Sequence, residues 1–366
     1  MDVKKRLKER APTIEDVANH VELSVATVGR ALGGYGRVST STRERVLQAA
    51  RELNYHPNTI ARGMKEQRTR TIGLVVGNIT NPFFSTIVRA VEDTVSRYNL
   101  NVIVCNTDED PQKELAHAKT LFERRVDGLI VSSTIFGDAS AAKVAKTYYG
   151  KRIPTVFVDR AVNGIPAPAF LSDNVEGAYK ATQHLLALGH RCIGVIVGKR
   201  ALPTMAGRVQ GYKNALSEFS VPFTEALVMD SAVDADVGVE GGYSMTRRLL
   251  QQQDRPSALL VMNNLLVVGT LKALKEAQLQ IPQDLSLITW DDFELAEHLT
   301  PPLTLVDQPT YTMGSLAAEQ LMKAVMQNMK LEPLEVVLKP RLIVRESTRA
   351  VGSSTPVEPV YQGGGP

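Results

Sequence analysis

The stretch TIEDVANHVELSVATVGRAL, residues 13–32, decides how the N-terminal part of the chain folds. Thr13 can cap a first helix, and Asp16 three positions later completes an imperfect capping box. Apolar residues then recur at helical spacing, at Ile14, Val17, Ala18 and Val21. The pattern breaks at 21–23 and restarts after Ser24, which is a second cap. The stretch therefore predicts two short helices joined by a tight turn that contains no glycine.

A third helix is predicted after this pair. Ser41 and Glu44 form its capping box, and its apolar positions end before Pro57. Three short helices, the second of which begins with small residues, are typical of a helix-turn-helix unit that places its second helix in the major groove of DNA. A three-helix packing module without a ligand gives the same pattern, so the helices alone leave both interpretations open.

Residues 24–32 combine packing positions with an outward face. Small residues at the start of a helix let its backbone approach a groove closely, and the helix dipole favours phosphate there. We expect Val25, Ala26 and Arg30 to meet base edges and Thr27 to meet phosphate. The full set of predicted DNA contacts is Thr13, Ser24, Val25, Ala26, Thr27, Arg30, Asn58, Ala61, Arg62 and Met64.

The segment 58–71 is predicted to be a hinge helix followed by a basic linker. Such a helix is too short to be stable alone, which fits a segment that folds when its target is present. Met64 is a candidate wedge between base steps of a minor groove, and Arg62 would lie near phosphates. The alternative is an ordinary linker whose Met64 packs on the rest of the chain.

Charge is distributed unevenly along the 366 residues. Residues 1–70 hold 14 Lys and Arg against 8 Asp and Glu, whereas the whole chain carries a net charge of only +3. A basic N-terminal piece on a slightly acidic body indicates a polyanion-binding module joined to another domain. A solvated basic tail is the alternative, since five of the 14 lie in the first ten residues.

From residue 72 onward, short apolar runs alternate with helical stretches. This alternation predicts parallel sheets with helices on both faces, and the number of strands predicts two lobes. Ligands in such folds bind beyond the carboxyl ends of the strands, which here means the cleft between the lobes. The predicted strands are 72–77, 102–107, 128–133, 155–159, 193–198, 259–263 and 285–291, and predicted helices include 83–98, 111–125, 174–188, 206–219 and 265–278.

Polar residues follow several of these strands, where the rule places a ligand. Asp159, Asn263 and Asp291 each end a strand, and short side chains of this kind suit a ligand rich in hydroxyl groups. Arg208, near the start of a helix, can fork onto a carboxylate, a phosphate or a diol. Trp290, like Phe83, could offer an apolar face to a sugar ring. For any single Asp or Asn, a helix cap is the competing interpretation.

The chain resembles the LacI/GalR family of bacterial repressors in several blocks that occur in fixed order over residues 13–347. These blocks include TIEDVANHVELSVATVGRALGG, RTRTIGLVVGNITNPFF, SDNVEGAYKATQHLLALGHRCIGVIVG and IPQDLSLITWDD. The resemblance implies an α/β protein in which an all-α helix-turn-helix DNA-binding domain precedes a two-lobed core with parallel sheets, like the type I periplasmic binding proteins. It also implies a sequence-specific transcriptional regulator, a repressor, controlled by a small sugar, sugar acid or sugar phosphate.

The resemblance further implies the partners and the effector contacts. The partners are double-stranded, pseudo-palindromic operator DNA, the small-molecule effector and a second copy of the chain. The chain departs from the family pattern at Asn263-Asn264, at Thr289-Trp290 and at Gly29, so the resemblance does not transfer a specific effector. An alternative is a regulator whose DNA affinity is raised by a corepressor or a partner protein. With Trp290 added, the predicted effector contacts are Phe83, Asp159, Arg208, Asn263, Trp290 and Asp291.

Other classes of protein are not favoured. The sequence has no GxGxxG, GxxxxGK[ST], GxSxG or HExxH motif and its six histidines form no cluster, so we expect no enzyme, no metal site and no cofactor besides the effector. No apolar run reaches the roughly 18 residues that a membrane span needs. Without a secretory signal, and with two isolated cysteines, the chain is expected to be cytoplasmic and nucleoid-associated rather than a secreted solute-binding protein.

We therefore predict four segments. They are a helix-turn-helix domain at 1–57, a hinge helix and linker at 58–71, an effector-binding and dimerisation domain at 72–347, and a disordered tail at 348–366. The chain is expected to cross between the two lobes near 172, 303 and 332. Because the tail contains no leucine heptad, a two-fold homodimer is the expected assembly.

Overall fold

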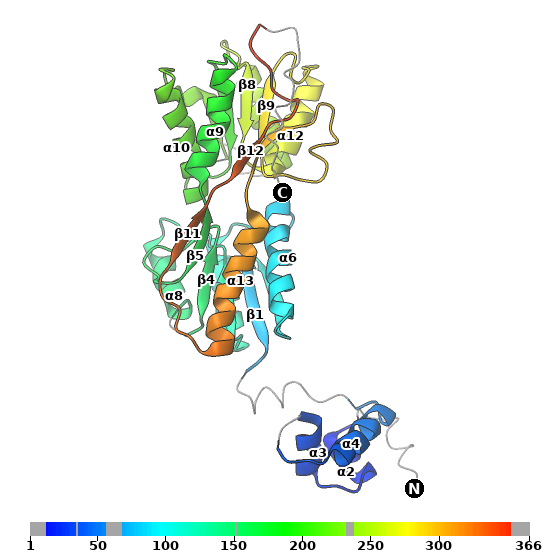
Figure 1. Cartoon of the computed structure of the whole chain (residues 1–366). Helices are drawn as coiled ribbons and strands as arrows, with labels where there is room; N and C mark the ends of the chain where they lie inside the picture. The colour runs from blue at the N-terminus through cyan, green and yellow to red at the C-terminus, as the bar shows by residue number, and fades with distance from the viewer. Residues whose placement is uncertain (1–11, 34–35, 56–67, 151, 232–237, 353–366) are drawn as a thin grey trace, which may run out of the picture. The chain divides into compact units, whose positions relative to one another are not determined.

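The computed structural model describes residues 12–33, 36–55, 68–150, 152–231 and 238–352 (Figure 1). The chain divides into two compact units, a helical unit at 1–69 and an α/β unit at 70–366. Within the described residues, no helix combines the length and the apolar composition that crossing a membrane requires.

The helical unit consists of α2 (Ile14–His20), α3 (Val25–Gly33) and α4 (Thr40–Glu52). Their apolar faces meet in a small core whose buried members include Val17, Val28 and Val46. The turn between α2 and α3 reverses the chain without glycine because Glu22 adopts a left-handed conformation, with φ of 54°. The three helices expected from the sequence are therefore present.

The helix caps agree with the sequence at one end of the unit and differ at the other. Thr13 donates its backbone N–H to Asp16 Oδ2 at 2.8 Å, as a capping box requires. The third helix, however, is capped by Ser39, whose Oγ accepts the backbone N–H of Thr42 at 3.2 Å. The cap predicted at Ser41 is thus two residues too late, because Ser39 and Ser41 present the same side chain to adjacent starting points.

The first lobe of the α/β unit is a six-stranded parallel sheet in the order β11-β5-β4-β3-β1-β2. One face is covered by α6 (Pro82–Ser96) and α13 (Thr310–Gln327), and the other by α7 (Pro111–Glu123) and α8 (Ala139–Tyr148). The strands are β1 (Thr71–Val76), β2 (Asn101–Asn106), β3 (Gly128–Val131), β4 (Thr155–Val158), β5 (Ala169–Ser172) and β11 (Glu335–Leu338).

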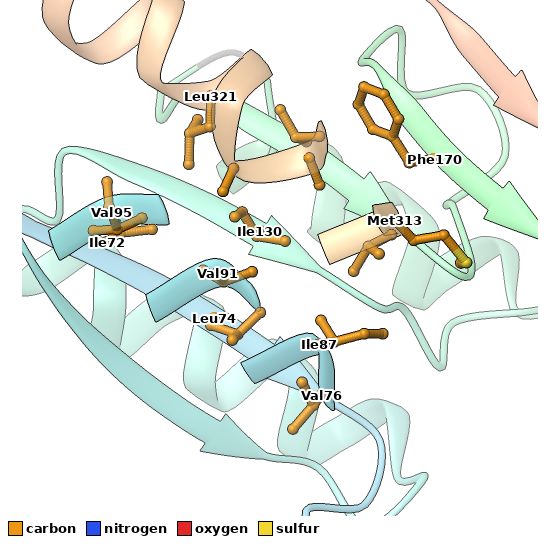
Figure 2. Packing of buried hydrophobic residues seen from close by; sticks show 14 of the residues in the cluster. Ile72, Leu74, Val76, Ile87, Val91, Val95, Ile130, Phe170, Met313 and Leu321 are labelled. Atoms are coloured by element: carbon orange, nitrogen blue, oxygen red, sulfur yellow. The ribbon is translucent and has the colours of Figure 1, made fainter. Parts of the chain in front are cut away.

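Strand β1 shows why the apolar runs of this sheet are continuous. Its alternate residues Ile72, Leu74 and Val76 pack under α6 and α13, as Figure 2 shows. Val75 points to the opposite face and packs under α7 and α8. A strand between two helical layers must be apolar on both sides, so the sequence shows an unbroken run instead of alternation.

The second lobe has the same organisation. Its six-stranded sheet has the order β12-β10-β9-β8-β6-β7 and is parallel except for β12, which pairs antiparallel with β10. Helices α9 (Asn174–Ala187) and α10 (Pro203–Glu218) cover one face, and α11 (Val239–Leu250) and α12 (Asn264–Glu276) cover the other. The strands are β6 (Ile193–Val197), β7 (Val228–Asp230), β8 (Ala258–Val261), β9 (Ser286–Trp290), β10 (Thr304–Asp307) and β12 (Arg341–Ile343), and the 3₁₀ turn η1 (Glu225–Leu227) precedes β7.

The chain passes between the lobes three times. It leaves β5 at Ser172 for α9, leaves β10 at Asp307 for α13, and leaves β11 at Leu338 for β12. The second and third crossings follow the ends of β10 and β11, at Asp307 and Leu338. They lie a few residues beyond the predicted positions near 303 and 332. The α/β class with two lobes and parallel sheets is the fold that the sequence indicated.

The C-terminal segment begins as an ordered part of the second lobe. Residues 348–352, which the sequence analysis assigned to a disordered tail, are held by backbone contacts of their own. Arg349 donates its N–H to Ser286 Oγ at 3.1 Å, and Val351 donates to the carbonyl of Leu188 at 2.9 Å. Residues 353–366 lie outside the described part of the chain.

Candidate functional site

Helix α3 presents a continuous outer face. Val28 and Ala31 point inward and are buried in the helical core. Ser24, Ala26 and Arg30 are exposed, and Val25 keeps 43% of its surface exposed. The side chains of this outer face are thus accessible to a partner. The residues Ser24, Val25, Ala26 and Arg30, which were predicted to contact DNA, are therefore not buried in the helical core.

Hydrogen bonds organise this face before any ligand is present. Ser24 Oγ accepts the backbone N–H of Thr27 at 3.2 Å, so Ser24 caps α3. Arg30 lies back along the helix and donates from Nε to the Ala26 carbonyl at 3.3 Å. Thr13 is half-buried, and its hydroxyl donates to Asp16 at 2.8 Å. The remaining predicted DNA contacts, Asn58, Ala61, Arg62 and Met64, lie outside the described residues.

One interaction in this unit was not foreseen from the sequence. Arg45 on α4 donates from Nη2 to the carbonyl of Val21 at 3.2 Å. This bond fixes the end of α2 at the turn that sets the angle between α2 and α3. Arg45 gave no signal in the sequence because its partner is a backbone group 24 residues away.

A cavity lies between the carboxyl ends of the strands of the two lobes. The first lobe contributes side chains from the start of α6 and the end of β4, and the second contributes side chains from α10, the start of α12 and the end of β9. The predicted residues that line it are Phe83, Asp159, Arg208, Asn263 and Asp291. Five of the six predicted effector contacts, which are far apart in the sequence, thus share one cavity.

Phe83 is placed by the start of α6. Pro82 occupies the first turn, and Asn81 caps the helix by accepting the Phe83 backbone N–H at 3.0 Å. The rings of Phe83 and Phe84 meet edge to face with centroids 5.1 Å apart. Phe83 therefore has a fixed orientation at the cavity, while Asn81 serves both as a cap and as a lining residue.

Asp159 directly follows β4 and has a left-handed backbone, with φ of 64°. Its carboxylate accepts from Ser132 Oγ at 3.2 Å and lies 3.2 Å from Arg160 Nε. Burial raises the pKa of Asp159, and the positive charges of Arg160 and Arg208 offset only part of that effect. A buried carboxylate with room to accept further hydrogen bonds is suited to a ligand hydroxyl group.

Arg208 enters the cavity from α10 and is almost fully buried. It donates from Nε to Asn174 Oδ1 at 2.7 Å and also bonds the carbonyl of Met262. Burial lowers its pKa to about 10, against the opposing influence of Asp291 and Asp159. The guanidinium stacks on the Trp290 ring at 4.1 Å from the ring centroid.

Trp290 does not line the cavity, contrary to its predicted role. Its side chain is fully buried in the core of the second lobe, behind Arg208. The strand alternation that turns Asp291 toward the cavity turns Trp290 away from it. Trp290 therefore packs against the Arg208 guanidinium inside the second lobe and does not form part of the cavity wall.

Asp291 follows β9 with a left-handed backbone, φ of 65°, and its Oδ1 accepts from Gln308 Nε2 at 2.5 Å. Burial raises its pKa to about 6, although Arg208 and the Gln308 hydrogen bond both favour the charged form. With its amide nitrogen facing the Asp291 carboxylate and the Trp290 carbonyl, Asn264 donates to Asp291 Oδ2 at 3.1 Å. Asn263 caps α12 through its oxygen, which accepts the N–H of Leu265 at 2.9 Å, so its amide nitrogen is the group that can serve a ligand.

The cavity also contains charged residues outside the predicted set. Glu109, Arg160 and Lys199 line it, and Glu109 pairs with Arg160. Arg160 directly follows Asp159 at the end of a predicted strand, whereas Glu109 reaches the cavity only through the conformation of its loop. Among the described residues, no group of three or more His, Cys, Asp or Glu side chains is arranged to hold a metal ion.

Comparison with known proteins gives this arrangement a context. Residues 13–58 match the model "Bacterial regulatory proteins, lacI family", and residues 182–348 match "Periplasmic binding protein-like domain". The ribose operon repressor of Haemophilus influenzae is 35% identical over 335 residues, which cover 92% of this chain and 98% of that protein.

Solved structures agree on the fold. The lac repressor dimer bound to operator and the anti-inducer ONPF superposes with a TM-score of 0.81 at 24% identity, over 93% of this chain and 100% of that one. A LacI family regulator from Enterococcus faecium with bound ribose superposes with a TM-score of 0.65 at 29% identity, over 77% of this chain and 99% of that one. The chain thus belongs to the lacI family of bacterial regulatory proteins: it is a DNA-binding transcriptional repressor, not an enzyme, and an effector acts through its periplasmic-binding-protein-like domain.

Proposed function

We propose that the effector is a small sugar or sugar derivative and that it binds in the cavity between the two lobes. The observation that carries this proposal is the placement of Asp159 and Asp291, which come from the strand ends of opposite lobes, in one cavity with the guanidinium of Arg208. Buried carboxylates accept hydrogen bonds from the hydroxyl groups of a sugar, and a guanidinium donates hydrogen bonds to the oxygens of those hydroxyl groups. Phe83 supplies an apolar face, and Asn263 supplies an amide donor.

The relatives support the same class of ligand. One relative is a ribose operon repressor, and one solved neighbour holds ribose. Ribose is small and carries several hydroxyl groups, so it is the natural first probe. Sugar acids and sugar phosphates share the hydroxyl groups and add a charge, so the same panel should include them.

The DNA-binding role is assigned to the outer face of α3. We propose that two copies of the chain form a two-fold dimer and place two α3 helices in successive major grooves of a pseudo-palindromic operator. Val25, Ala26 and Arg30 would meet base edges, and Ser24 and Thr27 would meet phosphates. The segment around Asn58, Ala61, Arg62 and Met64, together with Thr13, completes the proposed contact set. The site of action is the nucleoid in the cytoplasm.

Effector control follows from the two lobes sharing one ligand. A ligand that touches both lobes favours one arrangement of the lobes over another, and DNA affinity changes if the two arrangements hold the 58–64 segments differently. An inducer would lower the affinity for the operator. A corepressor or a partner protein would raise it, so the sign of the change separates the two versions of the repressor.

A duplex selected by the purified full-length chain from random sequence provides the probe for the test. Its binding is followed by fluorescence anisotropy while ribose, other neutral sugars, sugar acids and sugar phosphates are added, and thermal shift reports which of them bind. We expect one class to stabilise the protein and to change DNA affinity. Asp291→Ala should keep DNA binding and lose the response, whereas Asp292→Ala, which removes a neighbouring acid paired with Arg345, should keep both.

The DNA role has its own test. Arg30→Ala should weaken binding to the selected duplex by roughly 1–3 kcal/mol and leave non-specific binding much less affected. Because Arg30 is exposed, the melting temperature should not change. An unchanged preference for the selected duplex would remove Arg30 from the set of base contacts, and a DNA affinity that no ligand class alters would remove the proposed effector.

A further inference from the structure

An ion pair between two of the protein's own side chains, Arg160 and Glu109, lies in the wall of the effector cavity. Arg160 donates from Nη1 to Glu109 Oε2 at 2.6 Å and from Nη2 to Glu109 Oε1 at 3.0 Å. The Arg160 side chain is 3% exposed and that of Glu109 is 14% exposed, and both line the cavity. This two-point geometry is the one with which arginine binds a carboxylate or a phosphate group of a ligand. Glu109 therefore occupies the position that such a ligand group would take.

The loop that carries Glu109 is shaped to hold it there. Asp108 and Glu109 both have left-handed backbones, with φ of 52° and 58°, and Glu109 donates its N–H to the Gly77 carbonyl at 3.2 Å. Gly77 leaves the space that the pair needs, since a Cβ at this position would lie 2.1 Å from Glu109 Oε1 and 2.7 Å from Arg160 Nη2. The left-handed backbone of Asp108 and Glu109 and the missing side chain of Gly77 together hold the Glu109 carboxylate against Arg160.

The rest of the Arg160 guanidinium is also engaged within the protein. Its Nε lies 3.2 Å from Asp159 Oδ2 and 3.3 Å from Ser132 Oγ. Burial works against the charged form of Arg160, but Glu109 and Asp159 outweigh that effect and hold its pKa above the usual value. The fork of Arg160 is thus already filled by two carboxylates of the protein, while the fork of Arg208 is bound to an amide oxygen and a backbone carbonyl.

The charges around the cavity balance because of Glu109. Among the described residues, the charged side chains that line it are Glu109, Asp159, Arg160, Lys199, Arg208 and Asp291. Without the carboxylate of Glu109, positive charge would be in excess, and an anion entering beside Arg160 would gain a two-point contact. With it, an anionic group would meet a carboxylate at close range, and such like-charge contacts are costly where water is excluded.

We propose that Glu109 fills an anion subsite of the effector cavity from within and so selects neutral effectors over those that carry a carboxylate or a phosphate group. This inference rests on the proposed function, in that it names which members of the sugar class the cavity accepts. It makes Glu109 a specificity-determining residue and assigns Arg160 as the group that would bind the anion if Glu109 were absent.

The test removes the carboxylate and offers the subsite a free anion. Binding of inorganic phosphate, and of the matched pair D-ribose and D-ribonate, is measured by calorimetry at constant ionic strength for the full-length chain and for Glu109→Ala. We expect the wild-type protein to bind ribose in preference to ribonate and to bind phosphate only weakly. The variant should bind phosphate roughly tenfold or more tightly than the wild type, and its ribonate-to-ribose preference should rise by a similar factor.

Asp108→Ala is the matched control. It removes the same charge from the neighbouring residue, but Asp108 is exposed, pairs with Lys113 at 2.6 Å and does not line the cavity. It should behave like the wild type towards all three probes. Equal gains in the two variants would show that net charge alone is responsible, and this would overturn the assignment of a subsite.

Two further measurements keep the inference decidable. If Glu109→Ala does not fold, Glu109→Gln retains the shape and a hydrogen bond to Arg160 while removing the charge, and it should still raise the ribonate-to-ribose preference. Tighter binding of ribonate than of ribose by the wild-type chain would overturn the inference without any variant. If the wild type binds no sugar at all, the proposed effector class fails, but phosphate binding by Glu109→Ala still decides whether the subsite exists.

Discussion

The two lobes place one aspartate each at the same point of the fold and support it in different ways. Asp159 follows β4 and Asp291 follows β9, and each strand is third from one edge of its sheet. Both residues are left-handed, and each donates its N–H to the next strand, Asp159 to Phe170 at 2.9 Å and Asp291 to Val306 at 2.8 Å. The backbone of the two lobes therefore treats the two residues alike.

The side chains around the two aspartates are not alike. The first lobe gives Asp159 a cation of its own, Arg160, which Glu109 also binds. The second lobe gives Asp291 the neutral donors Gln308 and Asn264 and leaves Arg208 as the nearest positive charge. Burial raises the pKa of both carboxyl groups. The difference teaches that a shared backbone site can hold a carboxylate within a closed ion network in one lobe and a carboxylate supported mainly by neutral donors, with its pKa raised to about 6, in the other.

Arg160→Met should have the largest effect, because it removes the cation from the closed network. Two largely buried carboxylates, Asp159 and Glu109, would lose their partner, and breaking a buried pair in this way costs about 3–5 kcal/mol. Urea denaturation at pH 7.5 would report the loss in the free energy of unfolding. Adding Glu109→Gln to this variant should recover part of the loss. An unchanged midpoint would mean that the network contributes nothing and that the lobes do not differ as described.

Asp291→Asn should stabilise the protein, and the gain should depend on pH. The pKa of Asp291 is raised to about 6 in the folded chain, so its protonated form favours folding below about pH 4, and this contribution is lost as the pH rises through 6. Asparagine mimics the protonated form at every pH. The gain should thus be small at pH 4 and approach about 3 kcal/mol above pH 7. Denaturation curves at both pH values check this, and an equal gain at both would contradict the assigned pKa. The effector response should be lost.

Gln308→Leu tests the neutral support of Asp291. Removing the amide donor should cost about 1–2 kcal/mol at pH 8, where Asp291 is charged, and less at pH 5, where it is mostly protonated. The buried Oε1 of Gln308 has no hydrogen-bond partner within the described structure, so its removal offsets part of the cost. Thermal unfolding at the two pH values would measure the difference. A loss that is larger at pH 5 would show that Gln308 supports something other than the charged carboxylate.

Ser132→Ala should have the smallest effect of the series. Ser132 Oγ donates to Asp159 and accepts from Arg160, but the two charged groups stay in contact without it. We expect a loss of about 1 kcal/mol in the free energy of unfolding. A loss as large as that from Arg160→Met would mean that the hydroxyl, rather than the charges, holds the network together.

Much of the fold could be predicted from local patterns, and parts of the site could as well. The caps and apolar spacing of residues 13–32 gave α2 and α3, and the buried strands of both sheets appear in the sequence as unbroken apolar runs. Five of the six effector contacts predicted from the sequence line the cavity, because strand ends and helix starts are local features that the topology gathers at one edge. The cap of α4 was misplaced because Ser39 and Ser41 offer the same side chain two residues apart.

What the sequence determined by itself was the class of structure and the kind of residue at each strand end, since periodicity and capping act over a few residues. Only the tertiary structure decided the partners of those residues. Trp290 turned out to lie behind Arg208, and Glu109 to close onto Arg160 51 positions away. The physical reason is that the energy of a buried charge is set by every group around it, and that environment exists only after distant parts of the chain have packed together.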